Sequence, residues 1–180
     1  MQKIYLVTGN KNKLKELREI LRKDLPLGLK SLEIEEIQSL DIYDVARKKA
    51  KKAYELINKP VVIEDVSFYF DLWKNFPGPL IKWFSKSMTP QDFYNLVKSK
   101  KKKGAKAVCV VCYFDGENFS FFTGEVKGKI VSPKGKSNFG FDPIFQPKGY
   151  TKPYGKLKNK NKISHRAIAW KKFEKFILNQ

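Results

Sequence analysis

The chain has 180 residues, of which 42% are apolar and 14% aromatic, a composition typical of a globular protein and not of a disordered one. Its 37 Lys and Arg residues exceed its 18 Asp and Glu residues, and the formal charge of +19 attracts polyanions such as nucleic acid, nucleotides or acidic surfaces. No apolar run approaches the length of a membrane span, and the first residues enter a strand pattern without a signal-peptide layout. We therefore expect a cytoplasmic protein with no membrane partner.

Cys109 and Cys112 are the only cysteines, and both lie in the apolar run AVCVVCYF. Residues three apart on a strand point to opposite faces of a sheet. We therefore expect two buried free thiols in a reducing cytoplasm, with neither a disulfide nor a metal between them.

The N-terminal region predicts a strand, a polar loop and a helix. Residues 3–8 read as a strand, residues 9–12 break the pattern, and an apolar stripe at helical spacing covers residues 13–23. Such a turn directs free backbone N–H groups and the positive end of the helix dipole to one point, which favours phosphate binding. Lys11 and Lys13 lie at its rim, but the glycine spacing of a Walker loop is missing.

The next region predicts a second helix that carries an unusual lysine. Residues 24–31 are expected to form a loop, and the run LEIEEI at 32–37 a short strand. A helix begins after Asp41, a residue typical of an N-cap, and its apolar face extends to Ile57. Lys49 lies on that face, where it either extends past apolar neighbours to solvent or reaches an anion.

The stretch from Pro60 to Phe84 predicts a buried central strand that stops on two acids. Val61 to Ile63 are apolar and β-branched, and Glu64 and Asp65 follow directly. Carboxylates at the end of a buried strand are costly unless they are paired, hydrated or bound to a metal. A solvated acidic pair and a metal site both fit this pattern.

The following region predicts a helix, a hairpin and an irregular segment. The helix begins at Thr89, which is followed by proline and an acid. Residues 105–131 form the hairpin, in which Gly124 and Gly128 are expected to mark bulges. Residues 132–153 are rich in Gly, Pro and aromatics without a clear period, and such segments are often functional.

The last helix is expected to begin near Ser164, with His165 and Arg166 in its first turn. Cations there oppose the helix dipole, so we expect them to interact with a bound hydrogen-bond acceptor. The alternative for Arg166 is an ion pair with a carboxylate that fixes the helix. We find no internal repeat and no linker between domains. Strands that alternate with helices, followed by a hairpin, predict an α/β fold with a mixed central β-sheet flanked by helices.

Four separated stretches together resemble one protein family. They are TGNKNK near the N-terminus, EIQ with ARKKA downstream, ED followed by FPGPLIKWF, and FGFDPIFQP with ISHR near the end. Their order and spacing are similar, over essentially the whole chain, to the inosine triphosphate pyrophosphatases, the noncanonical purine nucleoside triphosphate pyrophosphatase or Ham1-like family. The related Maf-type pyrophosphatases open with a Ser-Pro-Arg-Arg type of loop, which this chain lacks.

The resemblance implies an elongated, two-lobed fold in which residues 1–180 form one domain with an active-site cleft. It implies hydrolysis of ITP, dITP and XTP to the nucleoside monophosphate and pyrophosphate with Mg²⁺, which removes deaminated purines from the nucleotide pool. It also implies a cytoplasmic homodimer that binds the nucleoside triphosphate, with no specific nucleic-acid partner despite the basic charge.

Carried onto this chain, the resemblance assigns catalysis, metal binding and substrate binding to particular residues. Asp65 and Lys49 are implied as catalytic residues, and Glu36 with Asp65 as metal ligands. Phe139 is implied to stack on the base. The implied substrate-binding residues are Thr8, Gly9, Asn10, Lys13, Phe139, Gly140, Phe141, Asp142, Lys160, His165 and Arg166.

These residue types also suit the reaction on chemical grounds. Attack on the α-phosphate needs charge neutralisation, which a hard cation held by carboxylates, together with lysines, supplies. A carboxylate beside that cation orients or deprotonates the water. Oxo purines carry an acceptor at O6 where adenine carries a donor, so donors such as His165 and Arg166 favour them.

Departures from the family pattern leave other interpretations open. The family continues the acidic pair with Thr-Gly or Ser-Gly, whereas Val66 and Ser67 follow it here, and two family glutamates are replaced by Lys156 and Asn159. The chain is therefore the active enzyme, an inactive family member kept as a scaffold, or a nucleic-acid binder whose affinity falls steeply with salt.

Overall fold

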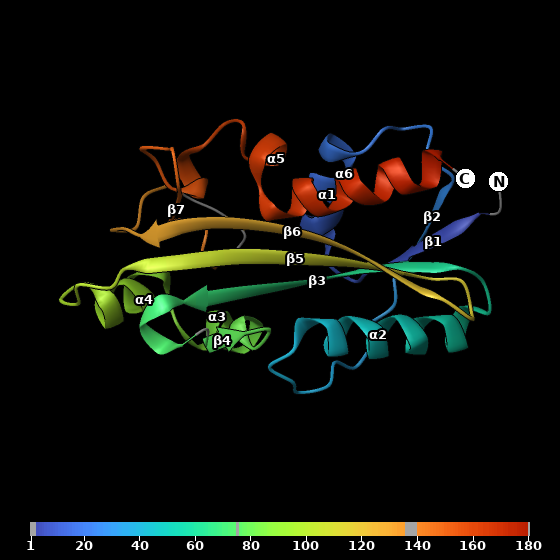
Figure 1. Cartoon of the computed structure of the whole chain (residues 1–180), viewed down its shortest axis with the longest axis horizontal. Coiled ribbons are helices and arrows are strands. Elements are labelled where there is room, and N and C mark those ends of the chain that lie inside the picture. Colours follow the sequence, from blue (N-terminus) through green and yellow to red (C-terminus); the bar gives the residue numbers. More distant parts are fainter. Residues whose placement is uncertain (1–2, 75, 136–139, 180) are drawn as a thin grey trace.

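The computed structural model describes residues 3–74, 76–135 and 140–179. In this part of the chain, seven strands form one mixed sheet in the order β2-β1-β3-β5-β6-β7, with β4 paired to β3. Helices cover both faces of the sheet (Figure 1), which confirms the predicted α/β class. No helix in these ranges is long and apolar enough to cross a membrane.

The strands combine a parallel and an antiparallel part. β1 runs parallel to β2 and β3, and the other neighbours are antiparallel. The parallel part follows from the early strand–helix alternation, and the antiparallel part is built around the long β5–β6 hairpin. The strands are β1 (Ile4–Val7), β2 (Leu27–Lys30), β3 (Val61–Phe70), β4 (Phe76–Gly78), β5 (Gly104–Phe114), β6 (Phe119–Ile130) and β7 (Phe145–Pro147).

The helices divide between the two sides of the sheet. α2 and α3 lie on one side, and α1, α5 and α6 on the other (Figure 1). Cys109 is buried in the core beneath α6 and Cys112 in the core beneath α2, and both are free, as predicted. The helices are α1 (Lys11–Ile20), α2 (Ile42–Ile57), α3 (Ile81–Ser87), α4 (Pro90–Val97), α5 (Lys160–Ile163) and α6 (His165–Leu178), with 3₁₀ turns at Asp71–Trp73 and Tyr154–Lys156.

The starts of three helices follow capping chemistry. The side chains of Asp41 and Ser164 each accept a backbone N–H from the first turn of the helix that follows. Thr89 and Asp92 form a reciprocal capping box at the start of α4. Each cap satisfies a backbone donor that the helix itself leaves without a partner, and all three predicted starts are confirmed.

The strand predicted at residues 32–37 is wrong. The strand of this region is β2, which lies a few residues earlier and pairs with β1 from Leu27 opposite Ile4 to Lys30 opposite Val7. Leu32 and Ile34 pack against the apolar cluster beneath α2 without joining the sheet. Their alternation with acids therefore reflects packing on one side of an irregular segment.

Two further details of the predicted strands change. β3 does not stop at Glu64 and Asp65 but continues to Phe70, so the acids lie in mid-strand. The β5–β6 register is continuous without a bulge at Gly124 or Gly128. Gly124 instead lets α6 approach the sheet, since a Cβ there would lie 2.0 Å from the carbonyl oxygen of His165.

Candidate active site

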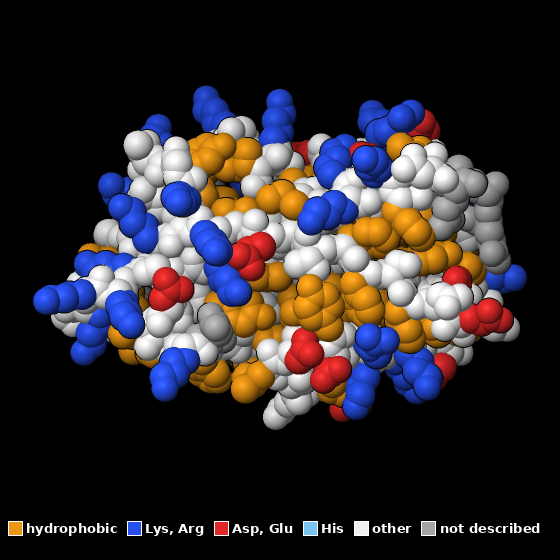
Figure 2. Space-filling view, in the orientation of Figure 1, with side chains coloured by type: hydrophobic (Ala, Val, Ile, Leu, Met, Phe, Trp, Pro, Cys, Tyr) orange, Lys and Arg blue, Asp and Glu red, His pale blue; other side chains and the backbone are white. Residues whose placement is uncertain are grey.

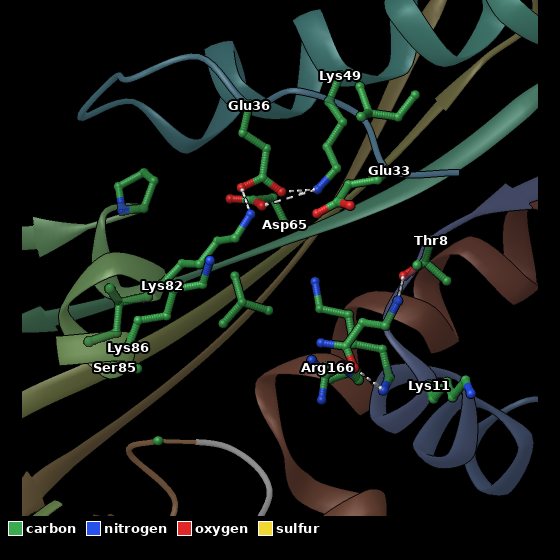
Figure 3. A pocket seen from close by; sticks show the side chains of 18 of the residues that line it. Thr8, Lys11, Glu33, Glu36, Lys49, Asp65, Lys82, Ser85, Lys86 and Arg166 are labelled. Carbon is green, nitrogen blue, oxygen red and sulfur yellow. Dashed lines mark hydrogen bonds and ion pairs between the residues drawn. The ribbon is translucent and has the colours of Figure 1, made fainter. Parts of the chain in front are cut away.

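A pocket of about 610 Å³ lies between α1, α2, α3 and the start of α6 (Figure 3). The residues that line it come from the whole length of the chain. Phe139 lies outside the described residues. Every other site residue predicted from the sequence lines this pocket: Thr8, Gly9, Asn10, Lys13, Glu36, Lys49, Asp65, Gly140, Phe141, Asp142, Lys160, His165 and Arg166.

Glu64 and Asp65 leave β3 on opposite sides. Successive side chains on a strand point to opposite faces of the sheet. Glu64 points toward α6, where it meets Arg166 and Trp170, and Asp65 points toward Lys49 of α2 and lines the pocket. The acidic pair is therefore two single carboxylates with different surroundings.

Asp65 has a carboxylate that its surroundings stabilise poorly. The nearest cation is the ammonium of Lys49, 3.7 Å from Oδ1, and the residue is only 7% exposed. Burial raises the pKa of Asp65 to about 6, because the loss of water outweighs the attraction of Lys49 and Lys13. Asp65 is ionised at neutral pH and still accepts a proton readily.

Glu36 and two lysines complete the acidic side of the pocket (Figure 3). Lys49 and Lys82 each donate to one oxygen of the Glu36 carboxylate, Lys82 at 2.8 Å. Burial raises the pKa of Glu36, but the two ammonium groups outweigh it and bring the pKa down to about 2. Lys49 thus reaches anions, which decides between the two interpretations of its place on the apolar face of α2.

The loop before α1 differs from the predicted phosphate-binding turn, because some of its backbone N–H groups are already hydrogen-bonded. The side-chain oxygen of Asn10 accepts the backbone N–H groups of Asn12 and Lys13, and the Thr8 hydroxyl accepts that of Asn10. These amides are therefore not free for phosphate. The loop also offers its side chains, including the ammonium of Lys13, which lies 3.2 Å from Glu64.

His165 lies at the buried end of the pocket. It is 2% exposed, and neither ring nitrogen has a hydrogen-bond partner among the described residues. Burial lowers the pKa of His165 well below its ordinary value, and the charges of Arg166 and Lys160 lower it further. The ring is therefore neutral, with one donor and one acceptor nitrogen, and the ring of Phe141 lies 5.8 Å away.

Arg166 belongs to a buried ion-pair network. Its guanidinium donates to both oxygens of Glu64, at 2.9 and 3.0 Å, and to Glu16. Trp170 donates to Glu64 at 2.7 Å, and Lys160 pairs with Glu16 and Asp142. Burial raises the pKa of Glu64, but Arg166 and Lys13 outweigh it and hold that pKa far below its ordinary value.

Of the two interpretations of Arg166, the ion pair with carboxylates is the one that the structure shows. His165 is uncharged, and the charge of Arg166 is balanced by Glu64 and Glu16 without any ligand. His165 and Arg166 both line the pocket, and recognition of the base by either residue remains a prediction.

Sequence reasoning missed some residues of the site. Glu16, on α1, joins Arg166 to Lys160, and no local pattern distinguishes it from an ordinary surface glutamate. Lys82 and Lys86 of α3 line the pocket. Their spacing of four residues on a helix that follows the FPGP turn was a usable signal, because such residues share one face.

The donor set fits Mg²⁺ only in part. Glu36 and Asp65 offer carboxylate oxygens around the same lysine, and carboxylate oxygens are the ligands that Mg²⁺ prefers. Within the described ranges, no group of three or more His, Cys, Asp and Glu side chains is placed to hold a metal. Mg²⁺ is usually held by one or two carboxylates with phosphate oxygens and waters, which is what these two residues would provide with a nucleotide present.

Carboxylates and lysines that share one pocket of a mixed α/β sheet define a site for an anionic, phosphate-bearing ligand. Residues 4–176 match the sequence model of the Ham1 family. The chain belongs to the Ham1 family, as its motifs predicted.

Relatives of known name cover nearly the whole chain. The inosine triphosphate pyrophosphatase of Scheffersomyces stipitis is 39% identical over 100% of both chains. That of Podospora anserina is 38% identical over 98% of this chain and 95% of its own.

Solved structures share the fold. A HAM1 protein from Coxiella burnetii has a TM-score of 0.87 at 24% identity over all of both chains. A nucleoside-triphosphatase, described as a dITP/XTP pyrophosphatase, from Mycobacterium abscessus has a TM-score of 0.74 at 24% identity over 95% of this chain and 98% of its own. At this identity the likeness concerns the fold.

Proposed function

We propose that this chain hydrolyses the noncanonical purine nucleoside triphosphates ITP, dITP and XTP to the monophosphate and pyrophosphate, and so removes deaminated purines from the nucleotide pool. The names of its relatives support the substrate class. The observation that carries the mechanism is the buried Asp65 carboxylate, whose pKa of about 6 suits proton transfer near neutral pH.

The reaction is a displacement at the α-phosphorus. A water oxygen bonds to the α-phosphorus, the bond from that phosphorus to the α,β-bridging oxygen breaks, and pyrophosphate leaves with the electron pair. Asp65 orients the water and accepts its proton, while Lys49, Lys82 and Lys13 stabilise charge on the phosphate oxygens. Mg²⁺, held by Glu36 and Asp65 with phosphate oxygens, would neutralise further charge during this step.

The base lies at the His165 end of the pocket in this proposal. A neutral imidazole there donates to the O6 acceptor of hypoxanthine or xanthine in the tautomer whose N–H faces the base. In that tautomer adenine, which carries a donor at the same position, would leave the buried N–H without a partner at a cost of about 1–3 kcal/mol. Arg166 lines the same end, and Phe139 remains the residue predicted to stack on the base.

The oligomeric state, the cellular compartment, the metal and the role of the basic charge belong to the same proposal. We infer a homodimer that acts in the cytoplasm and uses Mg²⁺, with residues 1–180 of each chain forming one domain of two lobes. The basic charge serves the attraction of anionic substrate. On the face that Figure 2 shows, lysine and arginine side chains are spread out and do not gather in one stripe, so this face lacks the pattern of a nucleic-acid surface.

Turnover of four nucleotides tests this proposal. ITP, XTP, ATP and GTP are incubated with the protein and MgCl₂, and pyrophosphate and inorganic phosphate are measured separately, with Asp65→Asn as a control for contaminating enzymes. We expect pyrophosphate from ITP and XTP, and poor turnover of ATP and GTP. Stepwise release of inorganic phosphate, or equal rates on ATP and ITP, would contradict the proposal, and no turnover at all would favour an inactive scaffold.

A further inference from the structure

α3 places two lysines side by side at the pocket. Lys82 and Lys86 are one helical turn apart, so they share a face of the helix, and both line the pocket. Their side chains extend from α3 toward Glu36 and Asp65 (Figure 3). The sequence motif FPGPLIKWF includes Lys82, but Lys86 lies beyond its end.

The two lysines differ in their partners. Lys82 donates to Glu36 at 2.8 Å, whereas Lys86 forms no ion pair with a carboxylate in the part of the chain that is described. The ammonium of Lys86 lies 4.7 Å from the centre of the Trp83 ring, and that of Lys82 lies 5.6 Å from it. A ring at this distance attracts a cation, so Trp83 positions the ammonium of Lys86 without neutralising it.

Most other cations of the pocket already have acidic partners. Lys13, Lys49, Lys160 and Arg166 each form ion pairs with carboxylates inside the pocket or behind it. Lys11 has no such pair among the described residues, but its side chain extends away from Glu36 and Asp65 (Figure 3). Among the described cations that line the pocket, Lys86 is therefore the one that faces Glu36 and Asp65 and whose charge is available to a ligand.

We propose that Lys86 binds the β- and γ-phosphates of the substrate, and hence the pyrophosphate that leaves, an inference that rests on the proposed function. With the base at the buried His165 and the α-phosphate at Asp65, the rest of the phosphate chain extends toward the open side of the pocket. Lys86 is exposed on that side. The most charged and most hydrated end of a nucleotide thus meets an exposed, unbalanced ammonium.

Three variants test this assignment. Lys86→Ala removes the ammonium, Lys86→Arg keeps the charge, and Lys98→Ala removes the same charge from the exposed end of α4, outside the pocket lining. The Lys98 variant controls for the change in long-range field. Melting temperatures confirm that all three proteins are folded.

In Lys86→Ala we expect the KM for ITP and the inhibition constant of pyrophosphate to rise together, by about 5–20-fold for the loss of a bond between charged groups at an exposed site. Inhibition by IMP, which lacks both terminal phosphates, should stay unchanged, and Lys86→Arg should remain within about twofold of wild type. Equal constants for Lys86→Ala and Lys98→Ala, or a loss of IMP affinity equal to that of pyrophosphate, would overturn the assignment.

Calorimetric binding of pyrophosphate with MgCl₂ gives a readout that does not depend on turnover. Weaker binding by Lys86→Ala than by Lys98→Ala supports the assignment even if ITP is not the substrate. Equal binding by the two variants, together with normal ITP turnover, would refute the role of Lys86 and leave the proposed function intact.

Discussion

Glu64 and Asp65 are neighbours on β3 and are almost equally buried, at 5% and 7% exposure, yet their pKa values move in opposite directions. Burial alone raises the pKa of any carboxyl group. At Glu64, Arg166, Lys13 and the Trp170 indole overcome that effect. At Asp65, the attraction of Lys49, whose ammonium lies 3.7 Å away, and of Lys13 does not overcome it.

The difference separates a structural from a chemical role. Glu64 is held on both oxygens and joins β3 to α6, so its negative charge stabilises the fold. Asp65 has a weakly balanced charge that faces the pocket, and it is the one that accepts a proton or a cation. Partners supplied by the opposite faces of the sheet, and not burial, decide which carboxylate does chemistry.

Asp65→Asn should show the largest effect on activity. We expect kcat for ITP to fall by about 10²–10⁴-fold, because the amide cannot accept a proton from water. The free energy of unfolding at pH 7 should not fall, since the folded state disfavours the charge that the variant removes. A steady-state assay with urea unfolding measures both, and near-wild-type turnover would show that Asp65 is only a buried strand residue.

Glu64→Gln should show the opposite pattern. Breaking a buried ion pair leaves Arg166 poorly compensated, and the free energy of unfolding should fall by about 3–5 kcal/mol. The folded fraction should keep kcat close to wild type. A loss of kcat as large as that of Asp65→Asn, without a loss of stability, would erase the distinction between the two carboxylates.

A double-mutant cycle on Glu64 and Arg166 sharpens the structural half of the comparison. Glu64→Gln and Arg166→Met should each lower the free energy of unfolding. The double variant should lose about 1–3 kcal/mol less than the sum of the two single losses, since each substitution removes the same ion pair. Arg166→Met should also narrow the ratio of kcat/KM between ITP and ATP if Arg166 donates to the base. If the losses of unfolding free energy were additive and the ratio of kcat/KM between ITP and ATP were unchanged, Arg166 would neither stabilise Glu64 nor recognise the base.

Lowering the pH should reduce the activity of the protein before it reduces its stability. As pH falls through about 6, Asp65 takes up a proton, and kcat/KM should decrease by up to tenfold per pH unit. The folded pKa of Asp65 is raised, so its protonation relieves a cost and does not destabilise the protein. The folded pKa of Glu64 is depressed, so the stability it contributes is present above its ordinary pKa of 4.5 and is lost only below that value.

Activity and circular dichroism measured on the same samples from pH 4.5 to 8 follow both carboxylates. We expect the activity to fall while the fold persists between about pH 4.5 and 6. A simultaneous loss of activity and circular dichroism signal in that window would contradict the assignment of separate roles.

Ionic strength should have the smallest effect. If the lysines steer the anionic substrate, kcat/KM should decrease as salt rises while kcat changes little, because screening weakens approach and not the bound complex. Stopped-time assays at several NaCl concentrations measure both constants. An equal decrease of kcat would show that salt acts on the site itself.

Local patterns predicted much of this molecule. The caps at Asp41, Thr89 and Ser164, the hairpin and the buried strand after Pro60 all follow from short-range rules. The motifs also placed the family and the residues that line the pocket. What these features share is that the signal lies within a few neighbouring residues.

The failures concern partners that are distant in sequence. The irregular segment at 32–37 resembled a strand, but the strand that pairs with β1 is residues 27–30. For Arg166 the sequence left a bound ligand and a carboxylate partner both open, because the partner, Glu64, lies 102 positions away. The different roles of Glu64 and Asp65 are likewise set by α6 and α2, and nothing in the dipeptide itself reveals them.

Hydrolysis of ITP in H₂¹⁸O tests the central claim most directly. If water oriented by Asp65 attacks the α-phosphorus, the label enters IMP and the released pyrophosphate carries none. Mass spectrometry of the two products decides this in a single experiment. ¹⁸O in the pyrophosphate, or labelled inorganic phosphate, would place the attack elsewhere on the phosphate chain and contradict the account.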